Sequence, residues 1–420
     1  MKKYTFIGPF KQILPMTGLS LKGSLNDHQL PLIENGGLII ADKNIYAVGP
    51  YQDLLEKARA VNAEIVHIEI EMVCLPGLID AHTHICFGGS RANDYALRNA
   101  GKTYLEIAKA GGGIWDTVTQ TRNTCPEDLI AGIRQRANRH LHQGVTTIEV
   151  KSGYGLSVEK ELDTLIAIAN ADKAIAPDLI PTCLAAHMVP QDFLGTPVEY
   201  LAEIGTDLLP ILRKEGLTNR IDAFVEEGAF SPSLIAPYLQ KAKEMGFDIT
   251  IHADQFSTGG SAIAVKYGAI SADHLEASAD NEIQLLAKSN VVAIALPGAS
   301  MGLGCNFAPA RKLLDAGASL AIASDWNPGS APMGNLILQA AILGAFEKLT
   351  NTEVLSGITF RAAAALNLWD RGKLEIGLLA DMISFPTGNY QEILYQQGML
   401  LPSKIWKNGK CVRNDIPNKK

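Results

Sequence analysis

Short apolar runs alternate with amphipathic stretches from about residue 74 to residue 370 of this 420-residue chain. The runs are rich in β-branched residues and end in polar clusters, a pattern typical of buried strands. The stretches between them have helical spacing, and the one at 126–144 has Pro126 near its start and Gly144 after its end. Eight runs share this form: 73–84, 144–155, 178–187, 220–230, 247–256, 269–278, 290–300 and 319–330.

This alternation predicts an α/β fold. Strands that alternate with helices pair in parallel, and eight such units predict a closed (β/α)8 TIM-like barrel rather than an open sheet. We place this barrel domain at 74–370. The two ends of the chain, 1–73 and 371–420, carry short β-like runs between Gly, Pro and Asn turns. We expect both ends to assemble into one small β-sandwich domain.

Composition and charge narrow the class of protein. Hydrophobic residues make up 47% of the chain, and 37 basic against 44 acidic residues give a net charge of −7. No basic run is long enough to favour nucleic acid or an anionic membrane as a partner, so a small-molecule substrate is expected. The six cysteines lack C-x-x-C spacing, and neither a signal peptide nor a stretch of about 18 apolar residues is present. These features predict a cytoplasmic protein.

In a barrel of this type the chemistry lies at the carboxyl ends of the strands, so the polar residues there are the candidates. His82 and His84 follow the first run in the order H-x-H. On an extended strand, residues i and i+2 point to the same side, so both imidazoles can converge on one point. We expect Asp80 to orient one of these rings through its second nitrogen, as metal-bound histidines require.

Four further strand ends carry His187, His252, His274 or Asp325. Each histidine taken alone could be an ordinary core residue. However, five of the nine histidines of the chain fall at predicted strand ends, which random core placement would rarely produce. The other histidines are interpreted as surface or packing residues: His28, His67, His140 and His142.

A metal site follows from these positions. His82, His84, His252 and Asp325 offer three nitrogens and one oxygen, a set suited to one Zn²⁺ or Fe³⁺ ion per subunit, and the donor types do not choose between the two metals. Such an ion lowers the pKa of a bound water to about 7. The Asp325 carboxylate would take the proton of that water, and His274 would orient the nucleophile or stabilise charge.

Longer motifs resemble the amidohydrolase superfamily of metal-dependent hydrolases, and within it the branch that opens an imidazolone ring in histidine degradation. The resemblance covers essentially the whole chain. The H-x-H motif indicates only the superfamily, whereas the glycine-rich and NPGS motifs are more specific. The motifs are PGLIDAHTH (76–84), FGGSRANDY (87–95), AGGGIWDTVTQTR (110–122), EVKSGYGL (149–156), AAHMVP (185–190), HADQFSTGGS (252–261), SADHLE (271–276) and SDWNPGSAP (324–332).

The resemblance implies a barrel enzyme whose metal is held by the same four residues, with Asp325, His274 and His187 in catalytic roles. It implies hydrolysis of 4-imidazolone-5-propanoate to N-formimidoyl-L-glutamate. Arg91 would bind the propanoate bidentately, and His187 would hydrogen-bond the ring carbonyl. The implied substrate contacts are Arg91, Tyr154, His187, Gln255, Asn327, Gly329 and Ser330.

Two positions depart from the pattern of that branch. Some members carry glutamate where this chain has Gln255, and a glutamine side chain cannot titrate. The proton for the leaving nitrogen must then come from His274, Asp325 or a water. Trp326 stands where a smaller residue is common, and its bulk would reshape the floor of the pocket.

Two other functions compete with ring opening. One is deamination of a heteroaromatic ring on the same barrel, which would want an acid at the position of Gln255. The other is a non-catalytic scaffold, for which loss of the metal ligands would be expected, although fold alone does not exclude it. A homodimer is the expected assembly on general grounds.

Overall fold

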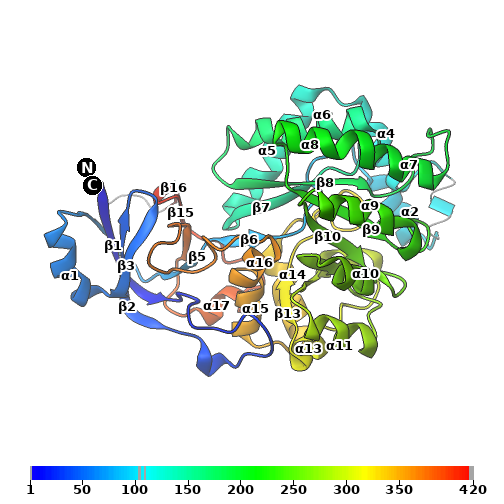
Figure 1. Cartoon of the computed structure of the whole chain (residues 1–420). Coiled ribbons are helices and arrows are strands. Elements are labelled where there is room, and N and C mark those ends of the chain that lie inside the picture. Colours follow the sequence, from blue (N-terminus) through cyan, green and yellow to red (C-terminus); the bar gives the residue numbers. More distant parts are fainter. Residues whose placement is uncertain (1, 103–105, 108–109, 416–420) are drawn as a thin grey trace.

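The computed structural model describes residues 2–102, 106–107 and 110–415. Figure 1 shows a small sheet that contains blue strands from the start of the chain and orange to red strands from its end, beside a larger barrel surrounded by helices. The prediction of a (β/α)8 barrel with a small β domain built from both ends is confirmed. Among the described residues, no helix combines the length and apolarity needed to cross a bilayer.

The small domain is one mixed sheet in the order β16-β15-β14-β5-β1-β2-β3, with β4 paired to β1. Strand β1 runs antiparallel to β2 but parallel to β4 and β5, and β14 joins the two ends of the chain by pairing antiparallel to β5. Phe10 and Trp406 meet edge to face across this join. The strands are β1 (Tyr4–Ile13), β2 (Ile33–Ala41), β3 (Asn44–Pro50), β4 (Glu64–His67), β5 (Val73–Pro76), β14 (Met382–Phe385), β15 (Lys404–Lys407) and β16 (Lys410–Asn414).

The barrel holds eight parallel strands in chain order. Its wall closes just beyond the first and last strands, where Asp325 N donates to His82 O at 3.0 Å and His84 N donates to Trp326 O at 2.9 Å. Closure therefore occurs at the carboxyl-end mouth. The strands are β6 (Leu78–Asp80), β7 (Val145–Lys151), β8 (Asp178–Ala186), β9 (Arg220–Val225), β10 (Asp248–Ala253), β11 (Ser271–His274), β12 (Val292–Ala295) and β13 (Ser319–Ile322).

Helices follow the strands and cover the outside of the barrel (Figure 1). Helix α5 begins at Pro126, as predicted, because proline lacks only an N–H that the first turn would leave unpaired. The helices are α1 (Tyr51–Ala60), α2 (Ala92–Asn99), α4 (Ile114–Asn123), α5 (Pro126–His142), α6 (Val158–Asp172), α7 (Pro197–Glu203), α8 (Leu209–Glu215), α9 (Pro232–Glu244), α10 (Gly260–Tyr267), α11 (Asp280–Lys288), α12 (Pro297–Leu303), α13 (Ala310–Ala316), α14 (Leu336–Glu347), α15 (Asn351–Gly357), α16 (Phe360–Ala365) and α17 (Gln391–Tyr395), with short 3₁₀ and π segments at Asp27–Gln29 and Ile204–Leu208.

The first apolar run does not form a single barrel strand. Residues 73–76 pair with β1 and β14 in the small sheet, and only 78–80 pair with β7 in the barrel. Gly77 lies between them, where a Cβ atom would stand 2.2 Å from Oγ1 of Thr146. The expectation of one strand was wrong because the run is uniformly apolar and fully buried on both sides of this glycine.

Candidate metal centre and active site

Three histidine side chains converge at the mouth of the barrel. His82 and His84 follow β6, and His252 lies in β10. Nε2 of His84 is 3.3 Å from Nε2 of His82 and 3.3 Å from Nε2 of His252. All three residues are at most 3% exposed, and their candidate ligand atoms lie within 4.8 Å of one another, so they can hold one metal ion.

Asp325 completes the group from the segment after β13. Its Oδ1 lies 3.5 Å from Nε2 of His82 and 3.4 Å from Nε2 of His84. This oxygen is buried and has no hydrogen-bond partner among the described residues, whereas Oδ2 accepts from Asn327 at 2.9 Å. Asp325 also adopts a φ of 47°, a left-handed conformation that is costly for a residue other than glycine and often occurs at functional sites.

The protonation states suit a cation. Burial lowers the pKa of His82, His84 and His252, in the last case to about 3, so the rings are neutral near pH 7. Burial raises the pKa of Asp325 to about 7, against the opposing positive charge of His274. Three neutral nitrogens and an orphaned carboxylate oxygen around one point fit a metal ion better than they fit one another.

Two buried carboxylates orient the histidine rings. Nδ1 of His82 lies 2.6 Å from Oδ2 of Asp273, and Nδ1 of His252 lies 2.8 Å from Oδ2 of Asp222. An Nδ1–H that donates to a carboxylate leaves the Nε2 lone pair free, which fixes the tautomer that a metal requires. Both rings therefore present Nε2 to the common centre.

Asp80 does not have the orienting role that its position predicts. Its Oδ1 accepts from Ser324 N at 3.0 Å, and its Oδ2 lies 3.0 Å from Nε2 of His140 in α5. The prediction was wrong because Asp80 points from β6 toward α5, while Asp273 reaches His82 from β11. His140 is fully buried, in keeping with a packing residue.

The strand-end positions predicted the histidines but not the charged residues within the strands, which lie inside the barrel. Nζ of Lys151 lies 2.8 Å from Oε1 of Glu149, 2.8 Å from Oδ2 of Asp222 and 3.8 Å from Oδ2 of Asp273. A signal was present, because Asp222, Asp273 and Lys151 interrupt apolar strands in which a lone charge would be costly to bury. Such interruptions indicate paired charges that face one another.

His274 lies at the end of β11 beside the three converging histidines. Its ring centroid is 5.2 Å from that of His252 and 5.8 Å from that of His82. Burial alone lowers the pKa of His274, but the carboxylates of Glu276 and Asp325 outweigh it and raise the pKa above its ordinary value. Nδ1 faces Oε2 of Glu276 at 3.5 Å, so His274 is suited to carry a proton at the edge of the site.

His187 and Tyr154 form the next layer. Their ring centroids are 5.7 Å apart, and each lies within 6 Å of the His84 ring. Nδ1 of His187 faces the carbonyl oxygen of Gly153 at 2.8 Å, so it carries the proton when the ring is neutral. Burial lowers the pKa of His187 and favours that neutral form. Nε2 then accepts rather than donates, unlike the predicted hydrogen bond to a carbonyl.

Arg91 lies near Gly329 of the NPGS turn. Its Nε donates to Asp94 at 2.5 Å and its Nη1 donates to Thr117 at 3.3 Å, while a Cβ atom built on Gly329 would be 3.2 Å from the same Nη1. The guanidinium is buried and held, with Asp94 offsetting its charge.

The NPGS turn is hydrogen-bonded to Asp325. Asn327 Nδ2 donates to both Asp325 and Ser330 Oγ, and its Oδ1 accepts from the backbone N–H groups of Gly329 and Ser330. These bonds fix the turn. Contact of its residues with a substrate stays a prediction.

The two unusual positions differ in their surroundings. Gln255 is half-buried in the loop after β10, and its side chain has no hydrogen-bond partner among the described residues, so it can turn toward a ligand. Trp326 packs edge to face on His140 at 4.7 Å, and the Arg139 guanidinium lies 5.0 Å from its ring. Trp326 therefore lies against α5, and its effect on the floor of the pocket stays a prediction.

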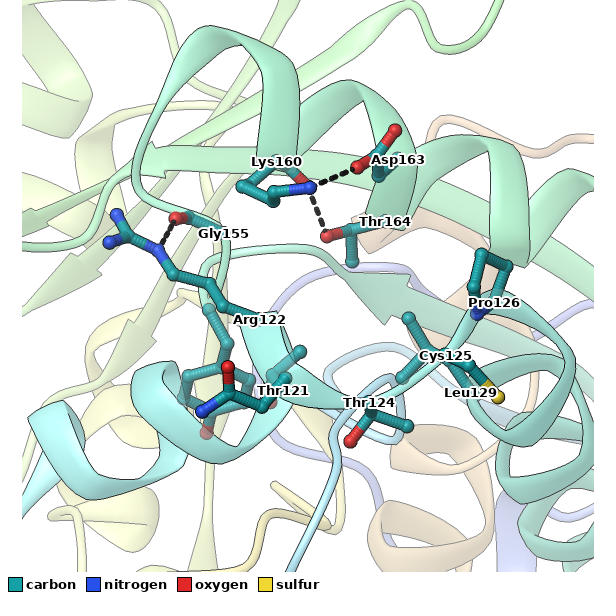
Figure 2. Close-up of a pocket in the computed structure, with 12 residues that line it drawn as sticks. Thr121, Arg122, Thr124, Cys125, Pro126, Leu129, Gly155, Lys160, Asp163 and Thr164 are labelled. Carbon is teal, nitrogen blue, oxygen red and sulfur yellow. Dashed lines mark hydrogen bonds and ion pairs between the residues drawn. The ribbon is translucent and has the colours of Figure 1, made fainter.

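A cavity of about 300 Å³ is lined by the end of α4, the start of α5, the turn at Tyr154 and Gly155, and the first turns of α6 (Figure 2). Arg122 points from α4 to the turn, where its Nε donates to Gly155 O at 2.7 Å, and Lys160 pairs with Asp163 at 2.8 Å. Both cations are thus engaged within the protein. The contact of Arg122 holds the backbone that presents Tyr154.

Comparisons with known proteins give both a family and a fold. A model of the amidohydrolase family matches residues 73–412. The imidazolonepropionase of Bacillus mycoides (strain KBAB4) is 40% identical over 396 residues, which cover 93% of this chain and 92% of that protein. The imidazolonepropionase of Bacillus cereus (strain ATCC 10987 / NRS 248) is 41% identical over the same shares.

Among solved structures, a mutant atrazine chlorohydrolase from Arthrobacter aurescens TC1, complexed with zinc and atraton, has a TM-score of 0.72. It is 17% identical, and the match covers 98% of this chain and 95% of that one. At this identity the likeness shows the fold alone.

Proposed function

Because the chain belongs to the amidohydrolase family and, within it, to the imidazolonepropionases, we propose that it hydrolyses a ring C–N bond of 4-imidazolone-5-propanoate to give N-formimidoyl-L-glutamate. The chain is a metal-dependent hydrolase of a small molecule. The observation that carries the proposal is the convergence of three neutral histidine nitrogens and the orphaned Oδ1 of Asp325 on one point.

The residues that would hold the metal are His82, His84, His252 and Asp325, and the ion is Zn²⁺ or Fe³⁺, one per subunit. The donor set of imidazole nitrogens and one carboxylate suits either ion. The chemistry that such an ion supplies is the acidification of a water molecule, so that hydroxide is available near neutral pH.

Asp325 is the group that accepts the proton of the attacking water. Its free Oδ1 faces the centre of the site, while Asn327 holds Oδ2 and fixes the carboxylate plane. A carboxylate in this position can take up a proton and release it again during the reaction. The same group can then deliver that proton to the ring nitrogen as the C–N bond breaks.

Gln255 cannot deliver a proton, so the acid must come from elsewhere. His274 is the second candidate, because Glu276 stabilises its protonated form and it lies beside His252. Gln255 then has only a positioning task, in which its amide hydrogen-bonds the ring nitrogens.

Arg91 would bind the propanoate tail, and Tyr154, Asn327, Gly329 and Ser330 would contact the ligand. The neutral His187, with Nδ1–H directed at Gly153, presents Nε2 as an acceptor for a ring N–H. This orientation would select the substrate tautomer that carries a proton on that nitrogen.

The test is the loss of the ultraviolet absorbance of the imidazolone ring when metal-replete protein is added. We expect rapid loss with the native chain and none with a His82→Ala variant, which lacks one metal-binding imidazole. Persistent absorbance with metal-replete native protein would contradict ring opening.

Deamination on the same barrel is disfavoured by the glutamine at 255, which supplies no acid. An adenosine deaminase from Xanthomonas campestris with bound zinc has a TM-score of 0.70 at 18% identity over 99% of this chain and 94% of that one, which shows the fold alone. Release of ammonia from heteroaromatic amines, without ring opening, would reverse the choice.

The net charge and the family also support a proposal for where the enzyme works and how it assembles. We propose that it works in the cytoplasm as a homodimer, with neither nucleic acid nor membrane as a partner, in line with its net charge of −7. Sedimentation of the purified chain at twice its 45.1 kDa mass is the expected result.

A further inference from the structure

Lys151 occupies an unusual place for a lysine. It is fully buried in the barrel at the end of β7, and its ammonium group lies between three carboxylates. Glu149 belongs to the same strand, but Asp222 and Asp273 come from β9 and β11, which do not pair with β7. These ion pairs therefore cross the interior of the barrel.

The two carboxylates from other strands connect Lys151 to the histidines. Oδ2 of Asp222 lies 2.8 Å from Lys151 Nζ and 2.8 Å from Nδ1 of His252. Oδ2 of Asp273 lies 3.8 Å from Lys151 Nζ and 2.6 Å from Nδ1 of His82. One ammonium group thus lies behind two of the three converging rings.

Charge explains why this link matters. Three buried carboxylates would repel one another without a cation between them, and this repulsion would push their side chains apart. A displaced Asp222 or Asp273 would release the ring whose Nδ1 it contacts, and the Nε2 atom of that ring would leave the common point.

We propose that Lys151 is a positioning residue of the metal centre, which holds Asp222 and Asp273 so that His252 and His82 present Nε2 to the ion. The proposal rests on the metal site proposed above, and it does not depend on the identity of the substrate.

The competing explanation is that Lys151 only stabilises the fold, as buried ion pairs elsewhere do. The chain offers a matched control in Lys407 of β15, which is 4% exposed and lies 2.5 Å from Asp381 and 2.7 Å from Asp178. Those carboxylates contact no metal-site histidine. Lys407→Met therefore removes a comparable buried charge without touching the centre.

The experiment compares the rate at which each purified, zinc-loaded chain loses metal to a chelator. Loss of a partner that orients a metal ligand typically weakens metal binding by about 10- to 100-fold. We expect Lys151→Met to lose zinc at least about tenfold faster than the native chain, and Lys407→Met to lose it at the native rate even if both variants melt at lower temperature.

Native-like zinc retention in folded Lys151→Met, or equally fast loss in Lys407→Met, overturns the proposal. If Lys151→Met does not fold, Lys151→Gln decides, because it keeps most of the side chain and can hydrogen-bond the carboxylates but carries no charge; faster zinc loss supports the proposal and native retention overturns it. A native chain that binds no zinc or iron overturns the metal site as well, whereas a metal-bound chain that leaves the imidazolone intact overturns only the proposed function.

Discussion

The interior of the barrel and its junction with the small sheet each contain a buried lysine between carboxylates. At the junction, Lys407 binds Asp381 and Asp178, and Arg371 also reaches Asp178 at 2.5 Å. This cluster ties the start of β8 to β15 and to the residue before β14. In the interior, the carboxylates around Lys151 contact histidines instead.

The two clusters show that burial and charge alone do not reveal a functional role. Both lysines are almost fully buried, and removing one partner from either cluster would leave an uncompensated charge, which typically costs about 3–5 kcal/mol. The difference lies in the next contact outward. Asp381 accepts from the backbone of Asn408, whereas Asp273 and Asp222 meet imidazole nitrogens.

Asp325→Asn should give the largest difference in kcat between a substitution in the barrel site and one at the junction. The amide cannot take up the proton of the attacking water, so we expect kcat to fall by roughly 10²- to 10⁴-fold, the range for loss of a general base. Asp381→Asn at the junction serves as the control and should leave kcat within a factor of two while lowering the melting temperature. A kcat for Asp325→Asn near the native value would remove Asp325 from proton transfer.

Asp222→Ala should come next in size. It leaves Nδ1 of His252 without an acceptor, and metal affinity should fall by about 10- to 100-fold. Asp178→Ala makes the same change beside Lys407 and should destabilise the fold without metal loss. Metal content after dialysis measures the first effect, and thermal melting measures the second. Equal metal content in the two variants would show that the carboxylates around Lys151 support metal binding no more than those around Lys407.

Arg91→Ala tests a third buried ion pair. Removal of a charged hydrogen bond to the substrate tail, worth about 1.5–3 kcal/mol, should raise KM roughly 10- to 100-fold with a smaller change in kcat. Arg371→Ala, which breaks an ion pair at the junction, should leave KM unchanged. Steady-state kinetics measure both variants. A native KM in Arg91→Ala would show that another residue binds the substrate carboxylate.

The smallest effect is expected for Gln255→Glu. A glutamate ionises with an ordinary pKa of about 4.3, and partial burial raises it, so kcat/KM should acquire an additional ionisation on its acid side. Activity would fall as the pH drops through that pKa, with less than a tenfold change at neutrality and native metal content. An unchanged pH profile would mean that position 255 only orients the substrate.

The pattern of apolar and polar positions along the chain predicts much of this fold. The eight apolar runs predicted the eight barrel strands because parallel strands buried on both sides read as continuous apolar segments. The same uniformity hid the division at Gly77, since no change of polarity marks where the chain passes from sheet to barrel. The H-x-H spacing and the strand-end positions make the histidines candidates from the sequence alone.

The partners of those histidines were harder to predict. Asp273 lies far from His82 in sequence, and the two meet only because the barrel brings β11 and β6 together across its interior. Asp222 meets His252 because β9 pairs with β10, a pairing that the sequence alone did not register residue by residue. Asp80, the neighbour in sequence, turned instead to His140 because its strand faces α5. Proximity along the chain therefore pointed to the wrong acceptor.

Gly77 gives the molecule a mechanical property. It is the single residue between the last small-sheet strand before the barrel and β6, and a side chain there would collide with Thr146 of β7. The chain therefore passes from the small sheet to the barrel through one glycine, and β6 then leads directly to His82. A substitute for the small domain would therefore have to keep a glycine at this position, so that β6 can still pair with β7.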